Sequence, residues 1–150
     1  MKKKHIRDYA TEAFRFYARV GGAGRYRQAL WERALMEREK SQGLGSGIAK
    51  PCEAALVRAE RAVMEADGAI ADLEAVERTL EYIRAQKNGQ DVLRAVEMVY
   101  LKEPEKEFGR GEMTARVRQA EMAIPASEKT VYRWLEAART EFARERGLRL

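Results

Sequence analysis

Two helical apolar patterns on either side of Pro125 constrain the fold of this chain more than any other feature of its sequence. Val117, Ala120 and Ile124 recur at the spacing of one helix face, which predicts a helix over 113–123. Proline has no amide hydrogen and disfavours helical geometry in the residue before it, so this helix must end at the proline. A second, longer helix is predicted by a further apolar stripe: Val131, Trp134, Leu135, Ala138 and Phe142. Two helices joined by about three or four residues are typical of the helix-turn-helix.

The start of the second helix carries both a cap and an outward polar face. Ser127 is expected to accept a backbone amide two or three residues further on, and Glu128 adds negative charge at the positive end of the helix dipole. In a helix-turn-helix this end meets base edges in the DNA major groove. There, arginine can bond two guanine acceptors and glutamate can accept from a cytosine amino group. The residues predicted to read bases are Glu128, Lys129, Tyr132, Arg133 and Glu136.

A second set of residues is expected to hold DNA phosphates, because backbone contacts position a protein on the duplex without specifying sequence. These residues are Arg110, Thr114, Arg116, Arg118 and Ser127. The alternative interpretation is that this face is merely solvated and that the two helices form a hairpin that reads no DNA.

Composition favours helices along the whole chain. Ala, Glu and Arg dominate, only three prolines occur in 150 residues, and strand-type alternation of Val and Ile is absent, so the predicted fold class is all-α. The formal net charge of +5 suits a polyanionic partner. This charge is uneven, because residues 1–50 carry +7, residues 51–109 carry −5 and residues 110–150 carry +3. The helix-turn-helix candidate is therefore basic, while the middle of the chain is acidic.

Residues 1–41 are predicted to form an N-terminal helical hairpin. An apolar pattern over 5–20 indicates a first helix, the glycine cluster at 21–24 breaks it, and later apolar residues indicate a second helix that ends by Ser41. Basic and aromatic residues lie together here: Arg15, Arg19, Arg25, Arg27, Phe14, Tyr17 and Tyr26. They fit either a second nucleic-acid surface, on which aromatics stack bases, or core aromatics surrounded by snorkelling arginines, which we favour.

Residues 42–50 are predicted to form a glycine-rich linker, because three glycines fall within five residues. Residues 51–88 are then expected to form one long central helix, with Gly68 as a candidate bend. Its apolar residues recur at nearly heptad spacing, so they fit either packing within the chain or the seam of a homodimer. This stripe comprises Val63, Ala66, Ile70, Leu73, Val76, Leu80 and Ile83. Residues 89–150, which begin with a short helix over 90–102, complete the predicted DNA-binding region.

Other classes of site find little support in the sequence. Cys52 and His5 are the only residues of their kinds, which excludes an internal disulfide and a Cys/His zinc site, so we expect no metal and no cofactor. With no carboxylate pair on an apolar wall either, little remains for acid–base or nucleophilic chemistry, and we expect no enzyme. No apolar run approaches the roughly 20 residues of a membrane span, and no signal-peptide core follows the lysine-rich start. We therefore expect a cytoplasmic protein that contacts no membrane.

Residues 70–146 together resemble region 4 of sigma factors, and within that group they look most like the small phage regulators of the ArpU and RinA type. The order is a helix of sequence AVERTLEYI, a second of sequence VLRAVEMVYL, and then TARVRQAEMAIPASEKTVYRWLEAARTEFA. The most specific part is 127–135, where a capping serine, a Thr-Val pair and outward polar residues match position by position. Glu121 and Pro125 depart from the pattern, which usually has a small residue and a glycine at these two places.

The resemblance implies a sequence-specific transcriptional regulator that binds double-stranded DNA, has no enzymatic activity, is often encoded in a prophage and controls late phage genes. It also implies that Val131 and Trp134 lie in the core. Two further partners, RNA polymerase and a second copy of the chain, stay open at this stage. The alternative function is a phage packaging or structural protein, such as a small terminase subunit, which also joins a helix-turn-helix to oligomerising helices.

Overall fold

The computed structural model describes residues 2–41 and 51–149. Within these ranges the chain forms seven α-helices, one π-helical turn and no strand, which confirms the predicted all-α class. The elements are α1 (Lys2–Val20), α2 (Ala23–Ser41), α3 (Pro51–Glu65), α4 (Asp67–Arg84), α5 (Gly89–Val96), η2 (Glu97–Leu101), α6 (Glu112–Ala123) and α7 (Glu128–Arg146). The linker predicted over 42–50 lies outside the described residues. Across the described ranges no helix is both long and apolar enough to span a bilayer.

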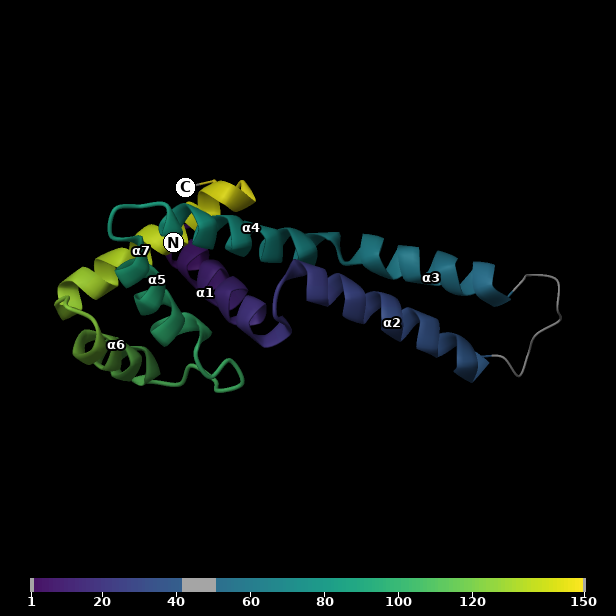
Figure 1. The fold of residues 1–150 in the computed structure, drawn as a ribbon, viewed down its shortest axis with the longest axis horizontal. Helices are drawn as coiled ribbons and strands as arrows, with labels where there is room; N and C mark the ends of the chain where they lie inside the picture. The colour runs from purple at the N-terminus through teal and green to yellow at the C-terminus, as the bar shows by residue number, and fades with distance from the viewer. Residues whose placement is uncertain (1, 42–50, 150) are drawn as a thin grey trace.

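The molecule has two parts, a helical bundle and a projecting arm (Figure 1). The bundle comprises α1, α4, α5, η2, α6 and α7. The arm comprises α2 and α3, which lie side by side and extend away from the bundle. Because α4 follows α3 almost directly and α1 precedes α2, both helices of the arm are anchored in the bundle at the same end.

Large apolar side chains fill the bundle. The ring of Phe14 stacks on that of Tyr100 with their centroids 5.4 Å apart, and its centroid lies 5.9 Å from that of Phe142. All three side chains are fully buried, and they share one cluster with apolar residues of α4, α5, α6 and α7. The first helix, the central helix and the C-terminal region therefore contribute to a single hydrophobic core.

The two predicted N-terminal helices are present, but they do not pair along their length. α1 enters the bundle, whereas α2 runs beside α3 (Figure 1). The turn between α1 and α2 contains Gly21 and Gly22, whose φ angles of 81° and 113° favour glycine. A carboxylate oxygen of Glu77 on α4 accepts a hydrogen bond of 2.7 Å from the amide of Ala23 at the start of α2. The helical hairpin of this protein consists of α2 and α3, and not of residues 1–41.

The predicted central helix is interrupted at Ala66, between α3 and α4, two residues before the glycine at which a bend was expected. Beyond this break the apolar stripe is buried within the chain. Its fully covered members are Ile70, Leu73, Val76 and Ile83. The stripe on α4 therefore packs inside the molecule, and it leaves no free seam there for a homodimer.

The short helix predicted over 90–102 is present and contains an irregularity. α5 continues into the π-helical turn η2, where the amide of Lys102 donates 2.8 Å to the carbonyl oxygen of Glu97, five residues earlier. A wider turn of this kind changes which carbonyl groups find partners inside the helix. Two of the carbonyl groups in this region, those of Val99 and Tyr100, accept hydrogen bonds from arginine side chains instead.

Candidate nucleic-acid interface

The connection between α6 and α7 is a four-residue turn built without a left-handed glycine. α6 ends at Ala123, and Ile124 then adopts an extended conformation, with φ −124° and ψ 140°, as expected for a residue before proline. The side chain of Ile124 is buried and covers the apolar contact between the two helices. The departure from the glycine pattern at Pro125 is therefore accommodated by an extended residue in front of it.

Ser127 is the N-cap of α7, as predicted. Its backbone is extended, with φ −75° and ψ 161°, and its hydroxyl oxygen accepts a hydrogen bond of 3.2 Å from the amide of Thr130. The hydroxyl of Thr130 lies 3.0 Å from the same oxygen. This cap ties the first turn of α7 together, because one of the otherwise unpaired amides is satisfied.

The apolar stripe predicted for α7 is confirmed. Val131, Leu135, Ala138 and Phe142 are almost completely buried, while Trp134 is half-buried at the edge of the core. They belong to the same cluster as three buried residues from the preceding helix and turn: Val117, Ala120 and Ile124. One face of α7 is therefore fixed against α6 and the rest of the bundle, and its opposite face is left outside.

All five residues predicted to read bases are exposed at the beginning of α7: Glu128, Lys129, Tyr132, Arg133 and Glu136. Tyr132 has 37% of its surface accessible. Within the described part of the chain, the side chains of Lys129, Tyr132 and Arg133 form no hydrogen bond or ion pair. The start of α7 therefore presents uncommitted donors and acceptors to solvent.

The residues predicted to hold phosphates divide into two groups. Arg110, Thr114 and Arg118 are exposed on α6 or just before it, and Ser127 is exposed at the cap. Arg116 is only 3% exposed, so its predicted role as a phosphate ligand is wrong. Its guanidinium donates to the carbonyl oxygens of Val99, at 3.1 Å, and of Lys102, and its Nε donates 3.0 Å to Glu112. A side chain with these internal partners is not free to meet DNA.

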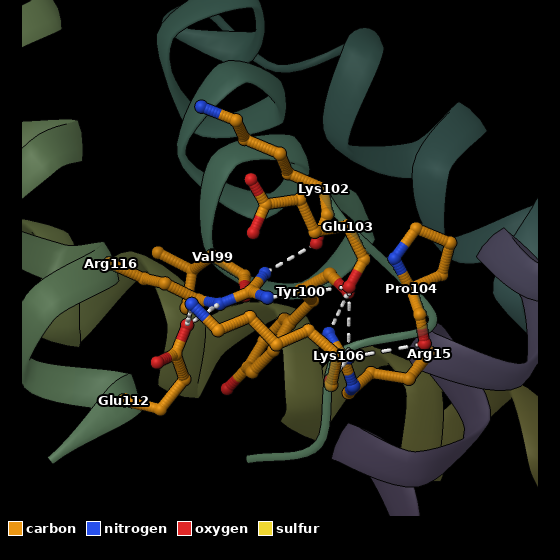
Figure 2. A network of polar contacts seen from close by, with 9 residues as sticks. All are labelled: Arg15, Val99, Tyr100, Lys102, Glu103, Pro104, Lys106, Glu112 and Arg116. Carbon is orange, nitrogen blue, oxygen red and sulfur yellow. Dashed lines mark hydrogen bonds and ion pairs between the residues drawn. The ribbon is translucent and has the colours of Figure 1, made fainter. Parts of the chain in front are cut away.

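Arg116 has a counterpart in Arg15 of α1, and Figure 2 shows both directed at the backbone that follows η2. The guanidinium of Arg15, 4% exposed, donates 3.1 Å to the carbonyl oxygen of Tyr100 and 3.2 Å to each of Glu103 and Pro104, and it also donates to Lys106. Carbonyl groups turned inward beyond the π turn thus find donors from two different helices.

The ring of Phe108 contacts both guanidinium groups. The central carbon of Arg15 lies 4.2 Å from the ring centroid, and that of Arg116 lies 4.7 Å from it. Cations over an aromatic face are attracted by the negative charge of the ring. We call Arg15, Arg116 and Phe108 the arginine clamp, because together they fasten the segment after η2 to α1 and α6.

The clamp also changes the acid–base properties of its members. Burial lowers the pKa of the Arg15 guanidinium, and the positive charge of Arg116 lowers it further. The hydrogen bond from Arg116 lowers the pKa of the Glu112 carboxyl. The pKa of Arg15 is thus lowered mainly by burial, and that of the neighbouring Glu112 mainly by the hydrogen bond it accepts. The signal of the clamp in the sequence is the pair of arginines flanked by apolar helix positions.

Three basic residues at the start of α1 lie beside α7, and sequence reasoning did not place them there. Lys3, Lys4 and Arg7 line one shallow depression together with three residues of α7: Glu136, Arg139 and Thr140. The two lysines and Arg7 are exposed. The basic start of the chain was visible in the sequence, but its position next to the outward face of α7 depends on the packing of α1 into the bundle.

A larger cleft of about 990 Å³, lined in part by Tyr132, lies between α1, α7 and the segment that the clamp holds. Its charged lining carries both signs: Arg7, Asp8, Glu12, Arg15, Arg19, Glu105, Lys106, Glu107 and Arg139. Such a mixed lining does not favour a polyanion. The basic residues next to α7 therefore define a better path for a nucleic-acid backbone than this cleft does.

Two further basic side chains of the N-terminal third, Arg19 and Arg27, form ion pairs within the chain. Arg19 pairs with Glu12 at 2.6 Å, and Arg27 pairs with Glu74 at 2.9 Å. Tyr26 packs edge-on against Phe16 with ring centroids 5.2 Å apart. These contacts favour the interpretation in which the aromatics of this region pack and the arginines surround them.

The described residues form no cluster of metal ligands. Among them, no three His, Cys, Asp or Glu side chains gather closely enough to hold a metal ion, and Cys52 is exposed at the arm. Comparisons of the chain with protein-family models, with curated proteins and with solved structures gave no match.

Proposed function

We propose that the protein binds double-stranded DNA in a sequence-specific manner and acts as a transcriptional regulator. One observation carries this proposal: a serine-capped helix turns its apolar stripe inward and leaves Lys129, Tyr132 and Arg133 exposed and unpaired at its N-terminal end. That end is the part of a recognition helix that meets base edges in the major groove. In this arrangement Arg133 bonds guanine acceptors, and Glu128 or Glu136 accepts from a cytosine amino group.

Phosphate contacts are assigned to exposed cations and hydroxyl groups on both sides of α7. Arg110, Thr114, Arg118 and Ser127 would hold the backbone on the α6 side, and the basic start of α1 would hold it on the other side. Cations on both flanks of a reading helix fix its register on the duplex without adding sequence preference. Arg116 is left out of this set, because it belongs to the arginine clamp.

Selection of bound duplexes from a random DNA pool tests the proposal directly. We expect one sequence motif to be enriched, and the affinity for that motif to fall steeply between a low and a high salt concentration, because bound phosphates release counterions. Recovery of random sequences at both salt concentrations, or no bound DNA at all, would refute the proposed function.

Replacing Arg133 by alanine tests the base-reading assignment. If Arg133 makes a bidentate contact with guanine, the selected duplex should bind about 1–3 kcal/mol more weakly, and the preference at one position of the motif should relax. Arg144→Ala is the matched control, since Arg144 is exposed near the other end of α7 and pairs with Glu141. Equal affinities for both variants, with the motif unchanged, would rule out the assignment.

Removing the three basic residues of α1 tests the phosphate assignment. In a Lys3→Ala, Lys4→Ala and Arg7→Ala variant, the slope of log affinity against log salt concentration should become shallower by about 0.9 for each phosphate that is no longer neutralised. The sequence motif should stay the same, because phosphate contacts carry no base information. A slope identical to that of the unchanged protein would remove α1 from the interface.

Regulation of late prophage genes is the more specific role that the sigma-like and ArpU/RinA-like pattern implies, and the packaging role is its competitor. The projecting arm is the observation that supports the packaging role, since such a function requires helices that oligomerise. Light scattering of the full chain separates the two, because a ring of many subunits supports packaging and a monomer or dimer supports regulation.

A further inference from the structure

The outer face of α3 exposes apolar side chains that the chain itself does not cover. Val57 is 55% exposed and Met64 is 74% exposed. Seven residues separate them, which is about two helical turns, so they lie on the same face. Figure 1 shows α2 along one side of α3 and no third described helix along the other. The helix thus carries an apolar pair where a lone surface helix would carry polar residues.

The residues between this apolar pair carry opposite charges. Glu60 and Arg61 are adjacent and exposed, and both line the same shallow depression as Val57 and Met64. Neither forms an ion pair within the described residues. The order along the face is therefore apolar, negative, positive, apolar.

This order is complementary to itself when the helix is reversed. If a second α3 runs antiparallel, with a twofold axis between positions 60 and 61, Val57 faces Met64 of the other copy and Glu60 faces its Arg61. The same two contacts recur on the other side of the axis, as a twofold interface requires. Among these four residues, each apolar side chain meets an apolar one and each charge meets its opposite, while Glu65 of the same depression falls beside Leu56 of the other copy.

We propose that the outer face of α3 is the contact surface for a second copy of this chain, packed antiparallel about that axis. A groove beside the face supports this occupant. Trp31 of α2 and Val63 and Met64 of α3 form its apolar lining, and Met64 is the residue that Val57 of the second copy faces in this register. The arrangement brings two arms together and carries the two bundles to opposite ends of the dimer.

The proposal does not depend on DNA binding, because the arm is separate from α7. It differs from the homodimer seam that the heptad-like stripe of the central helix left open, because α4 uses that stripe inside the bundle. The proposed contact surface is instead the outer face of α3, the helix that precedes α4.

Sedimentation equilibrium of the full chain without DNA, over a range of concentrations, tests the proposal. We expect a reversible equilibrium between one and two copies. In the Arg61→Glu variant, Glu60 of each copy faces a glutamate of the other copy. The dimer should therefore dissociate about tenfold more readily. The double variant Glu60→Arg and Arg61→Glu restores both opposite-charge pairs and should recover the original affinity.

Mixing single variants gives the sharpest measurement. Glu60→Arg alone and Arg61→Glu alone should each associate weakly, but an equimolar mixture of the two should form a heterodimer in which all four charges are paired. Met64→Lys should weaken the dimer about tenfold as well, whereas Met122→Lys, at a 90% exposed methionine of α6, should not.

The helical signal in the circular dichroism spectrum of each variant establishes that it is folded. A chain that stays monomeric at every concentration, or that forms a ring of many copies, overturns the proposal. So does a dimer that is unaffected by Arg61→Glu or that is not restored by the charge-swapped variant.

Discussion

The bundle and the arm are both helical, but they are held together in different ways. The bundle buries large side chains from five helices, among them Phe14, Tyr100 and Phe142. At the interface of α2 and α3, the buried apolar residues further out than Ala23, among those whose side chains are described, are alanines: Ala34, Ala55 and Ala59. Larger apolar residues of the arm, such as Met36 and Met64, point to solvent. The bundle thus has a core of its own, whereas the arm has a close contact between two backbones.

The part of the molecule that stabilises the fold is therefore different from the part that leaves apolar surface exposed. Apolar burial scales with the area removed from water, so most of the stabilisation lies in the bundle. The arm contributes less to the folded state of one chain and leaves more apolar surface exposed. A substitution of the same chemical kind should therefore have very different effects in the two parts.

The largest contrast is expected for truncation of an apolar side chain. Phe142→Ala should lower the free energy of unfolding by about 3–5 kcal/mol, since it leaves a cavity among buried rings. Met36→Ala, at a 69% exposed position of α2, should change it by less than about 0.5 kcal/mol. Urea denaturation of both variants measures the difference, and similar losses would mean that the arm has a core of comparable weight.

The arginine clamp should give the next largest effect. Arg116→Ala removes the donors for the carbonyl groups of Val99 and Lys102, and it should cost about 2–3 kcal/mol in the free energy of unfolding, because buried acceptors are left without partners. Arg118→Ala, two residues further along α6 and exposed, should stay within about 0.5 kcal/mol. If both variants melted alike, the clamp would not stabilise the bundle.

Two glycines should give effects of opposite sign, and Gly68→Ala the smaller change of the two. A Cβ added to Gly89 would come within 2.3 Å of the carbonyl oxygen of Ile83, so Gly89→Ala should destabilise the bundle by roughly 1–3 kcal/mol. A Cβ at Gly68, next to the joint with the arm, would meet no atom within 4 Å. Gly68→Ala should therefore stabilise the protein by about 0.5–1 kcal/mol. Thermal melts with the same sign for both variants would contradict this account.

The C-terminal pair of helices could be predicted from the sequence almost residue by residue. Pro125 ends one helix and Ser127 caps the next, and both effects depend only on residues a few positions away. The buried stripe of α7 could be predicted for the same reason, since helical periodicity is a local property. What a local pattern predicts well is which side of a helix is covered.

The buried state of Arg116 could not be predicted in this way. Arg116 lies four residues before the buried Ala120 and so borders the apolar face of α6, but the periodicity does not show the carbonyl groups across the fold that accept from its guanidinium. Those partners are carbonyl groups around a π-helical turn, and apolar periodicity does not reveal such a turn. The same applies to Arg15, whose acceptors lie 85 to 91 residues away in the chain.

The pairing of α2 with α3 is a third kind of case. Helix boundaries near Gly21 and Gly22 were evident, because glycine marks turns. Which neighbour each helix packs on depends on where α1 is seated, and that is decided by contacts with α4 and α7. Sequence neighbours suggested a hairpin, and long-range packing produced a different one.

The stacking of Phe14 on Tyr100 has a practical consequence for anyone cloning a smaller piece of this protein. A fragment that starts at residue 89 contains both helices of the interface and looks like a natural choice for binding assays. It would lack α1 and α4, leaving Tyr100 and Phe142 open to water and the carbonyl groups after η2 without Arg15. Such a fragment should aggregate or melt early, so binding assays require a recombinant product that retains the N-terminal helix.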